Sequence, residues 1–184
     1  MPILSIKNNP ISRYPNQCIL DSKQTWWIAK VKPRMEKALA REFFESKVEY
    51  YIPYYTNIIK RADSTAVRKS FLPLFPSYVP FACSNNPWEL LQNNRITTIL
   101  PVKAQGKFKH ELNQIYLAYE KNVSLYPVLN ESFIQEQSVQ VVSGPLKGTV
   151  GRVARLKGSE YLVLSVSGLG EACVSINMCD ICIV

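Results

Sequence analysis

The spacing of apolar and polar residues predicts a mixed first part and an all-β last quarter. Alternating or β-branched apolar runs are typical of strands, and apolar residues that recur every three or four positions are typical of helices. Met35, Leu39 and Phe43, for example, have helical spacing. The pattern predicts strands at residues 26–31, 48–59, 70–83 and 95–102, and helices at 35–46, from Asn86 onward and at 108–121.

Prolines predict bends and free edges in the first part. Pro53 interrupts the segment 48–59, and several prolines fall within 70–83. Because proline cannot donate to a β ladder, we expect at least one face or edge there to lack a partner strand. The polar residues 60–69 predict a hairpin tip, and Asn86 fits an N-cap followed by proline at the first helical position.

The last quarter has the pattern of a small antiparallel barrel. Alternating runs around Val139 and Val150 flank a glycine-rich turn, and further strands are predicted at 161–166 and 172–176. Glycines in such a turn can adopt backbone conformations that are barred to other residues, and proline fixes its own φ. The turn residues are Gly144, Pro145, Gly148 and Gly151. The density of valine favours strands here and therefore a stable barrel.

These elements predict an α+β fold in two domains. The order β-α-β-β-α-β-α indicates an α/β sandwich in which helices cover an antiparallel sheet. The expected organisation is an N-terminal arm at 1–25, the sandwich at 26–122, a linker at 123–136 and an all-β barrel at 137–184.

Composition and charge narrow the functional classes. The chain has 184 residues, 47% hydrophobic and 20% charged, which is typical of a globular protein. It has no long apolar run and no signal-peptide pattern, so we expect a soluble, cytoplasmic protein with no membrane partner. Residues 1–125 carry 18 Lys/Arg against 9 Asp/Glu, whereas residues 126–184 carry 4 against 5. The basic first part suggests contact with a polyanion, and a solvated cationic surface is the alternative.

The sequence predicts neither catalysis nor a cofactor. Its single histidine, His110, falls on a polar face of the helix at 108–121, with no catalytic triad, carboxylate pair or phosphate-binding loop. Cys179 and Cys182 form a Cys-x-x-Cys pair without a second pair or a nearby histidine, so we expect them to fill a terminal strand and to hold no metal. An odd total of five cysteines argues against a secreted disulfide framework.

Two motifs carry a resemblance to a known family. The run Gly-Pro-Leu-Lys-Gly-x-x-Gly at 144–151 resembles the KOW motif of SH3-like barrels. The strand Trp-Trp-Ile-Ala-Lys-Val at 26–31, with a hairpin ending Pro-Leu-Phe-Pro-Ser-Tyr-Val at 73–79, resembles the N-terminal (NGN) domain of the NusG family. The family pattern is usually Phe-Pro-Gly-Tyr, and Ser77 stands here in place of the glycine. The Pro-Leu-Phe-Pro form and the short basic hairpin are more similar to specialised paralogs such as RfaH and the antiterminators of polysaccharide operons.

The resemblance implies a non-enzymatic transcription elongation and antitermination factor. It implies that the NGN domain bridges the cleft of RNA polymerase, favours the closed clamp and so suppresses pausing and termination at specific operons. The implied contacts are Phe75, Pro76 and Tyr78 for the clamp helices, Asn86, Trp88 and Glu89 for the opposite pincer, and Lys32, Arg34, Lys37, Arg41 and Arg95 for the non-template DNA strand. For the barrel it implies docking to ribosomal protein S10 or termination factor Rho, and we expect a monomer.

Each implied contact has an alternative. Strand alternation places Phe75 with Val79 and opposite Tyr78, so one of these sets is core, and Tyr78 is the expected exposed anchor. Trp88 is equally consistent with a core position, and each single cation with a solvated surface. The alternative function is a ribosome-associated KOW RNA-binding protein, which predicts cations on the barrel, a part that is near neutral.

Overall fold

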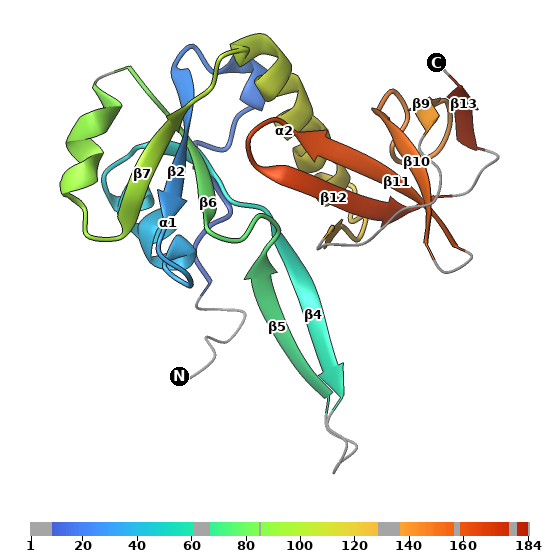
Figure 1. Cartoon of the computed structure of the whole chain (residues 1–184), viewed down its shortest axis with the longest axis horizontal. Helices are drawn as coiled ribbons and strands as arrows, with labels where there is room; N and C mark the ends of the chain where they lie inside the picture. The colour runs from blue at the N-terminus through green and yellow to red at the C-terminus, as the bar shows by residue number, and fades with distance from the viewer. Residues whose placement is uncertain are drawn as a thin grey trace. The chain divides into compact units, whose positions relative to one another are not determined.

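The computed structural model describes residues 9–60, 67–84, 86–128, 137–156, 159–176 and 180–183. The described residues form two compact units. The first unit contains the residues up to Gln17 and Lys23–Pro101, and the second contains Cys18–Ser22 and the residues from Val102 onward. The two units contain helices and antiparallel sheets, and the fold is α+β (Figure 1). The predicted hairpin tip at 61–66, part of the predicted linker and Cys179 lie outside the described residues.

The first unit is built around a five-stranded antiparallel sheet with the order β1-β3-β6-β2-β7. The central strand β6 (Tyr78–Cys83) pairs with β2 (Thr25–Val31), and β2 pairs with β7 (Ile96–Pro101) at one edge. β3 (Glu49–Tyr51) pairs with β6, and β1 (Arg13–Tyr14) pairs with β3 at the edge. The strands predicted from Trp26 and from Arg95 are thereby confirmed as β2 and β7.

Helix α1 (Glu36–Glu45) packs in the core of this unit. Leu39 and Phe43 are buried, and the ring centroids of Phe43 and Phe81 lie 5.3 Å apart. Each such side chain contributes about 1.5–3 kcal/mol through apolar burial. The predicted helical spacing is confirmed, except that Met35 precedes the helix and is 37% exposed.

A two-stranded ribbon, formed by β4 (Tyr54–Lys60) and β5 (Val67–Pro73), projects from the first unit (Figure 1). The prediction of single strands at 48–59 and 70–83 is wrong, because each segment divides between this ribbon and the main sheet. The first division falls at Ile52–Pro53, and the second falls in the turn that contains Pro76. Prolines suit these positions because they cannot continue a ladder.

The helix predicted from Asn86 is a short 3-10 helix, η3 (Pro87–Gln92). The Asn86 side chain accepts a hydrogen bond from the Trp88 N–H at 3.2 Å, so the predicted N-cap is confirmed. Residues eclipse one another in a 3-10 helix and its hydrogen bonds are poorer, which is why such helices stay short.

The described residues before β2 begin at residue 9, and we call residues 9–22 the arm. The carbonyl of Ile11 accepts from the Tyr50 hydroxyl at 2.7 Å, and the carbonyl of Ser12 accepts from Ile52 N–H at 2.6 Å. Further on, η2 (Ile19–Asp21) belongs to the second unit, where Lys109 Nζ donates to the Ser22 carbonyl at 2.5 Å. The irregular arm predicted at 1–25 therefore contributes an edge strand and a 3-10 turn.

The second unit combines helix α2 (Gln105–Glu120) with a six-stranded antiparallel sheet of order β13-β9-β10-β11-β12-β8. The strands are β8 (Tyr126–Pro127), β9 (Gln137–Val141), β10 (Val150–Leu156), β11 (Ser159–Val166), β12 (Gly170–Ser175) and β13 (Ile181–Ile183). Within the described part of the chain no pairing joins β8 to β13, so this sheet is open and the predicted barrel is not confirmed. β8 lies inside the segment predicted as linker. Its two residues pair with β12, so this part of the predicted linker is a strand.

Candidate functional site

The turn at residues 75–78 is held from two sides. Ser77 has a φ of 66°, a left-handed conformation in which a side chain is strained. Its N–H donates to Glu36 Oε1 at 2.8 Å, and its carbonyl accepts from Val31 N–H at 2.9 Å. The turn is thereby fixed both to the start of α1 and to the end of β2.

This turn places its three candidate contact residues differently. Phe75 is 3% exposed and belongs to the core, so it supports the turn without presenting surface. Pro76 is exposed and Tyr78, the first residue of β6, is half-buried. Only Pro76 and Tyr78 therefore offer area to a partner, as expected if alternation sends Phe75 inward.

The second candidate group lies at the start of η3. Trp88 is 46% exposed, so the alternative of a core position is wrong. Its ring packs edge to face against Trp27 with centroids 6.0 Å apart. Asn86 and Glu89 are also exposed, and the group forms an aromatic surface with polar neighbours.

Backbone contacts bring three of the five candidate cations together. Met35 N–H donates to the Lys32 carbonyl at 3.1 Å across a turn in which Arg34 has a φ of 67°. With Pro33 at its second position, this is the geometry of a type II turn. Lys32 N–H in turn donates to the Arg95 carbonyl at 2.9 Å, and the side chains of Lys32, Arg34 and Arg95 are exposed.

Arg95 is also paired with helix α1. Its Nη1 lies 2.8 Å from Glu42 Oε2, and Asn93 Nδ2 donates to the other carboxylate oxygen of Glu42. An exposed ion pair of this kind contributes only about 0–1 kcal/mol. Glu42 therefore holds the side chain of Arg95 only weakly.

The amino group of Lys37 makes contacts within the first unit. Its Nζ donates to Asn9 Oδ1 at 2.7 Å and to the Phe71 carbonyl at 2.6 Å, and lies 5.4 Å from the centroid of the Tyr54 ring. Burial, reinforced by the charge of Arg41, lowers the pKa of Lys37, against an opposing effect of Glu36. Lys37 thus ties α1 to the arm and to the base of the ribbon, while Arg41 is exposed.

The glycine-rich turn of the second unit uses its glycines in two ways. Gly144 and Gly148 have φ values of 75° and 89°, as expected for residues that need freedom from a side chain. Gly151 is different, and the prediction of a special conformation there is wrong. A Cβ at Gly151 would lie 2.7 Å from the Val163 carbonyl oxygen, so this glycine permits close approach of β10 and β11.

A small pocket of about 120 Å³ lies beside this turn. Val141, Leu146 and Pro145 supply apolar lining, and Ser143 and Asp180 supply polar groups. Ser143 Oγ donates to the Asp180 carboxylate. The pocket has the size of one side chain and a negative charge at its wall.

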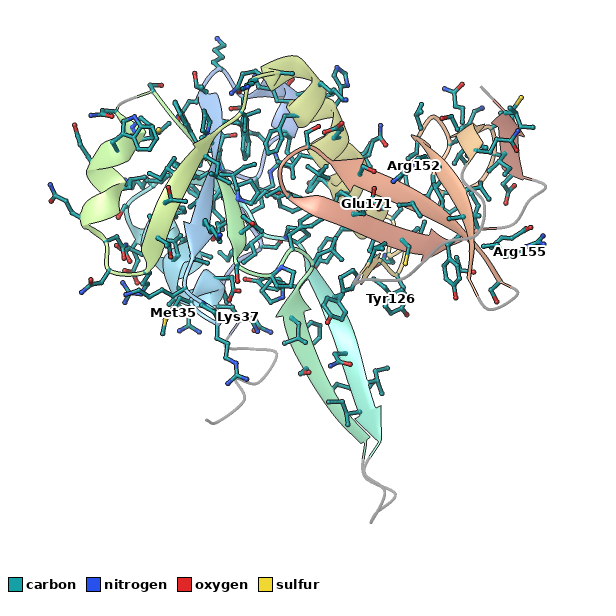
Figure 2. All side chains as sticks on the ribbon, viewed as in Figure 1. Met35, Lys37, Tyr126, Arg152, Arg155 and Glu171 are labelled. Atoms are coloured by element: carbon teal, nitrogen blue, oxygen red, sulfur yellow. The ribbon has the colours of Figure 1, made fainter. Side chains whose placement is uncertain are left out.

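Cations on the sheet of the second unit are engaged in cross-strand ion pairs. Arg152 of β10 pairs with Glu171 of β12, which also accepts from Ser165 Oγ at 2.9 Å (Figure 2). Arg155 pairs with Glu160 at 2.8 Å. These pairs reduce the positive surface available to a polyanion on this unit.

Sequence reasoning missed the contacts of Glu36 and Glu42 and the partners of the arm. Glu36 and Ser77 are 41 positions apart, and Glu42 and Arg95 are 53 apart, so no local spacing links either pair. A lone acidic residue at the start of a helix is also explained by the helix dipole, which hides its role in the turn.

The described residues contain no cluster of three or more His, Cys, Asp or Glu side chains that could hold a metal ion. Among the helices described, none is both long and apolar enough to cross a membrane.

Comparison with protein-family models matches residues 24–124, more than half of the chain, to NusG, described as transcription termination factor nusG. The matched range contains the turn at 75–78, the η3 group and all five candidate cations. The glycine-rich turn lies beyond it. No curated protein matches the chain.

Proposed function

Since this chain belongs to the NusG family of transcription factors, we propose that it is an antitermination factor that suppresses pausing and termination by RNA polymerase at specific operons. The family consists of non-enzymatic transcription elongation factors, and RNA polymerase is its general partner. The finer proposal concerns which surfaces make the contact and which nucleic acid they read.

The turn at residues 75–78 carries the proposal. Pro76 and Tyr78 stand on a segment whose backbone is fixed by Glu36 and Val31, so they are presented in one orientation. Rigid aromatic area is typical of binding hot spots, because little conformational entropy is lost on docking. We assign Pro76 and Tyr78, supported from the core by Phe75, to the clamp helices of the polymerase.

A second surface would reach the opposite pincer. The exposed ring of Trp88, with Asn86 and Glu89 beside it, offers apolar area at the start of η3. A factor that contacts both pincers more favourably in the closed state shifts the clamp toward closure in proportion to that difference. Closure disfavours pausing without any chemical step.

The non-template DNA strand is assigned to Lys32, Arg34 and Arg95, with Arg41 on α1 as a further cation. Three of these residues meet at one end of β2 and β7, and Glu42 holds the side chain of Arg95 only weakly. Lys37 is omitted from this set, because its amino group is engaged with Asn9 and Phe71.

The second unit is proposed to recruit a further partner through a KOW domain at 137–184, with S10 and Rho as the candidates. The pocket beside Gly144 and Pro145 supports a protein partner. The ion pairs of Arg152 and Arg155 disfavour the alternative of an RNA-binding KOW protein.

The decisive experiment is co-purification of RNA polymerase with the full chain, its Tyr78→Ala variant and a Tyr119→Ala control. Tyr119 is an exposed tyrosine on α2 of the second unit. We expect Tyr78→Ala to weaken polymerase binding by about tenfold or more, the loss typical of an interface hot spot. Tyr119→Ala should bind as the wild type does.

Transcription of long templates by paused polymerase supplies the second readout. The wild-type chain should shorten pauses and increase readthrough on templates that carry its target element, and Tyr78→Ala should not. If Tyr78→Ala bound polymerase as tightly as the wild type, the proposed contact of Tyr78 with the clamp helices would be wrong.

A further inference from the structure

The two outer edges of the β4–β5 ribbon differ in how they are protected. The ribbon is a sheet of two strands, so among the described residues neither strand pairs with a third. An unpaired strand edge is a template for another strand, and proteins usually block such edges with lysine, proline or a covering group. The edge of β5 has this protection, and the edge of β4 does not.

The register of the ribbon determines which backbone groups lie on each edge. Tyr54 is opposite Pro73, and Leu74 N–H donates to the Pro53 carbonyl at 2.8 Å. Because proline has no N–H, Tyr54 and Pro73 form a non-hydrogen-bonded pair, and such pairs alternate with hydrogen-bonded pairs along an antiparallel ladder. The backbone N–H and C=O groups of residues 54, 56, 58 and 60 therefore point away from β5, and those of residues 67, 69 and 71 point away from β4.

Three features protect the edge of β5. Lys37 Nζ donates to the outward carbonyl of Phe71 at 2.6 Å. Lys69 is exposed on the same strand, and Pro73 offers no donor to a further strand. A covering group, a lysine and a proline each oppose pairing at an edge.

The edge of β4 has none of these features. Residues 54–59 contain no lysine, arginine, acidic residue or proline. Among the described residues, the outward N–H and C=O groups of Thr56 and Ile58 have no hydrogen-bond partner. Ile58 and Ile59 are 54% and 49% exposed, so side chains on both faces of the strand are also uncovered. The edge of β4 is therefore uncharged and free to pair.

We propose that two copies of the chain form a dimer in which β4 pairs antiparallel with β4 of the second copy, about a two-fold axis at Asn57. A nucleic acid or an acidic peptide does not fit this edge, because either would need cations on residues 54–59. A second copy fits, because the chain has a net charge of +8 and two copies repel each other least where that charge is absent.

An axis at Asn57 matches the strand to itself along its whole length. Residue 54 is then opposite residue 60 of the second copy, 55 is opposite 59, and 56 is opposite 58. The outward groups of Thr56 and Ile58 form a hydrogen-bonded pair. Tyr55 lies opposite Ile59, and such aromatic and β-branched pairs stabilise antiparallel strands. The dimer contains a four-stranded sheet, which is more stable than an isolated two-stranded ribbon.

This interface is separate from the surfaces assigned to the polymerase and to the non-template strand. It uses none of their residues, and it differs from the monomer expected from the sequence. Dimer formation requires no polymerase, so its failure and the failure of the proposed function can be told apart.

Analytical ultracentrifugation of the full chain at increasing concentrations measures the dissociation constant of the dimer. A reducing buffer keeps the exposed Cys18 and Cys182 from forming disulfides between copies. The first variant is Ile58→Pro, which removes an outward N–H and no hydrogen bond of the β4–β5 ladder. Its matched control is Lys69→Pro, because the N–H of Lys69 points outward from the other edge.

We expect the wild type to form a reversible dimer. Ile58→Pro should raise the dissociation constant about tenfold or more, because by symmetry it removes two hydrogen bonds from the interface and leaves two carbonyls unpaired. Lys69→Pro should dimerise at least as tightly as the wild type. Tyr78→Ala should dimerise as the wild type does, which separates this interface from the polymerase contact.

Substitutions of Asn57 test the position of the axis. Asn57→Lys places two like charges directly opposite each other, so at low salt the dissociation constant should rise about threefold or more. Asn57→Glu alone should have the same effect. An equal mixture of the two variants should form a heterodimer at least as tight as the wild-type dimer. This test remains decisive if circular dichroism shows that Ile58→Pro does not fold.

A wild-type chain that stays monomeric at every concentration would overturn the proposal and would leave the edge of β4 to another partner. Assembly that continues beyond the dimer would overturn the closed two-fold interface. Equal weakening by Ile58→Pro and Lys69→Pro would mean that the edge of β4 is not the interface. If the mixed Asn57 variants did not recover dimer formation, the axis at Asn57 would be wrong.

Discussion

Ser77 keeps the backbone conformation of the family motif but not its usual residue. The family usually has glycine here, and the φ of 66° explains why, since a Cβ in this conformation costs about 1–2 kcal/mol. The hydrogen bonds to Glu36 and Val31 hold the serine in place despite this cost.

We therefore expect Ser77→Gly to raise the free energy of unfolding by about 0.5–1 kcal/mol. Relief of the strain exceeds the additional entropy, about 0.5–1 kcal/mol, that glycine loses on folding. Urea unfolding of the two proteins measures the difference. Ser77→Ala is the control: it keeps the Cβ and should gain nothing, and equal effects of the two substitutions would contradict the argument.

Tyr50 makes the stability depend on pH. It is fully buried in β3, and burial raises its pKa from 10.0 to about 12. The folded chain thus keeps the phenol proton at pH values where the unfolded chain loses it. This contribution is complete below about pH 10, and it falls by roughly 2–3 kcal/mol, the size of the shift, as the pH rises toward 12.

The Tyr50→Phe variant tests this contribution. It lacks the hydroxyl that donates to the Ile11 carbonyl, so near pH 8 we expect it to be about 1 kcal/mol less stable than the wild type. By about pH 11.5 the wild type should lose that advantage or fall below the variant. Urea unfolding of both proteins at each pH cancels the titration of the other tyrosines, and a difference independent of pH would contradict the assignment.

At the scale of elements, the arm completes the main sheet. It covers the edge of β3 through β1 and supplies partners to Tyr50, Ile52 and Lys37. An uncovered strand edge is a template for pairing with another chain.

Deletion of residues 1–22 should therefore lower the free energy of unfolding by at least about 3 kcal/mol, about 1 kcal/mol for each of these three hydrogen bonds. It should also cause association that increases with concentration in size-exclusion chromatography. Deletion of residues 1–8 is the matched control, because it retains all three partners. If both truncated chains unfolded at the same urea concentration, the arm would not be a stabilising element.

The local pattern of apolar and polar residues was sufficient to predict that most of the helices and strands exist. The periodicity of Leu39 and Phe43 identified α1, and Asn86 was correctly taken as a cap. It was insufficient at the breaks near Pro53 and Pro76, because a proline indicates that a ladder is interrupted but not which sheet the next residues join. β1 and β8 have two residues each, too few for any period to appear.

For the whole molecule, the contrast in charge between residues 1–125 and residues 126–184 can be counted from the sequence alone. The contacts of individual cations could not be predicted in this way, because Lys37, Arg95 and Arg152 meet partners distant in sequence. The same reason limited the candidate site: the turn at 75–78 was found from its motif, while Glu36, which anchors it, has no motif. Closure of a barrel likewise depends on pairing between strands far apart, and alternation alone did not reveal the open sheet.

The arm also has a consequence for the order in which the protein is made. Residues 11–14 leave the ribosome before their partners in β3, which follow about 40 positions later, and Lys109 follows its partner Ser22 by 87 positions. At a synthesis rate of about 5–20 residues per second, this delay lasts seconds, longer than a helix or hairpin needs to form. The arm therefore cannot form its native hydrogen bonds as it is translated, and it forms them only after β3 and Lys109 have been made.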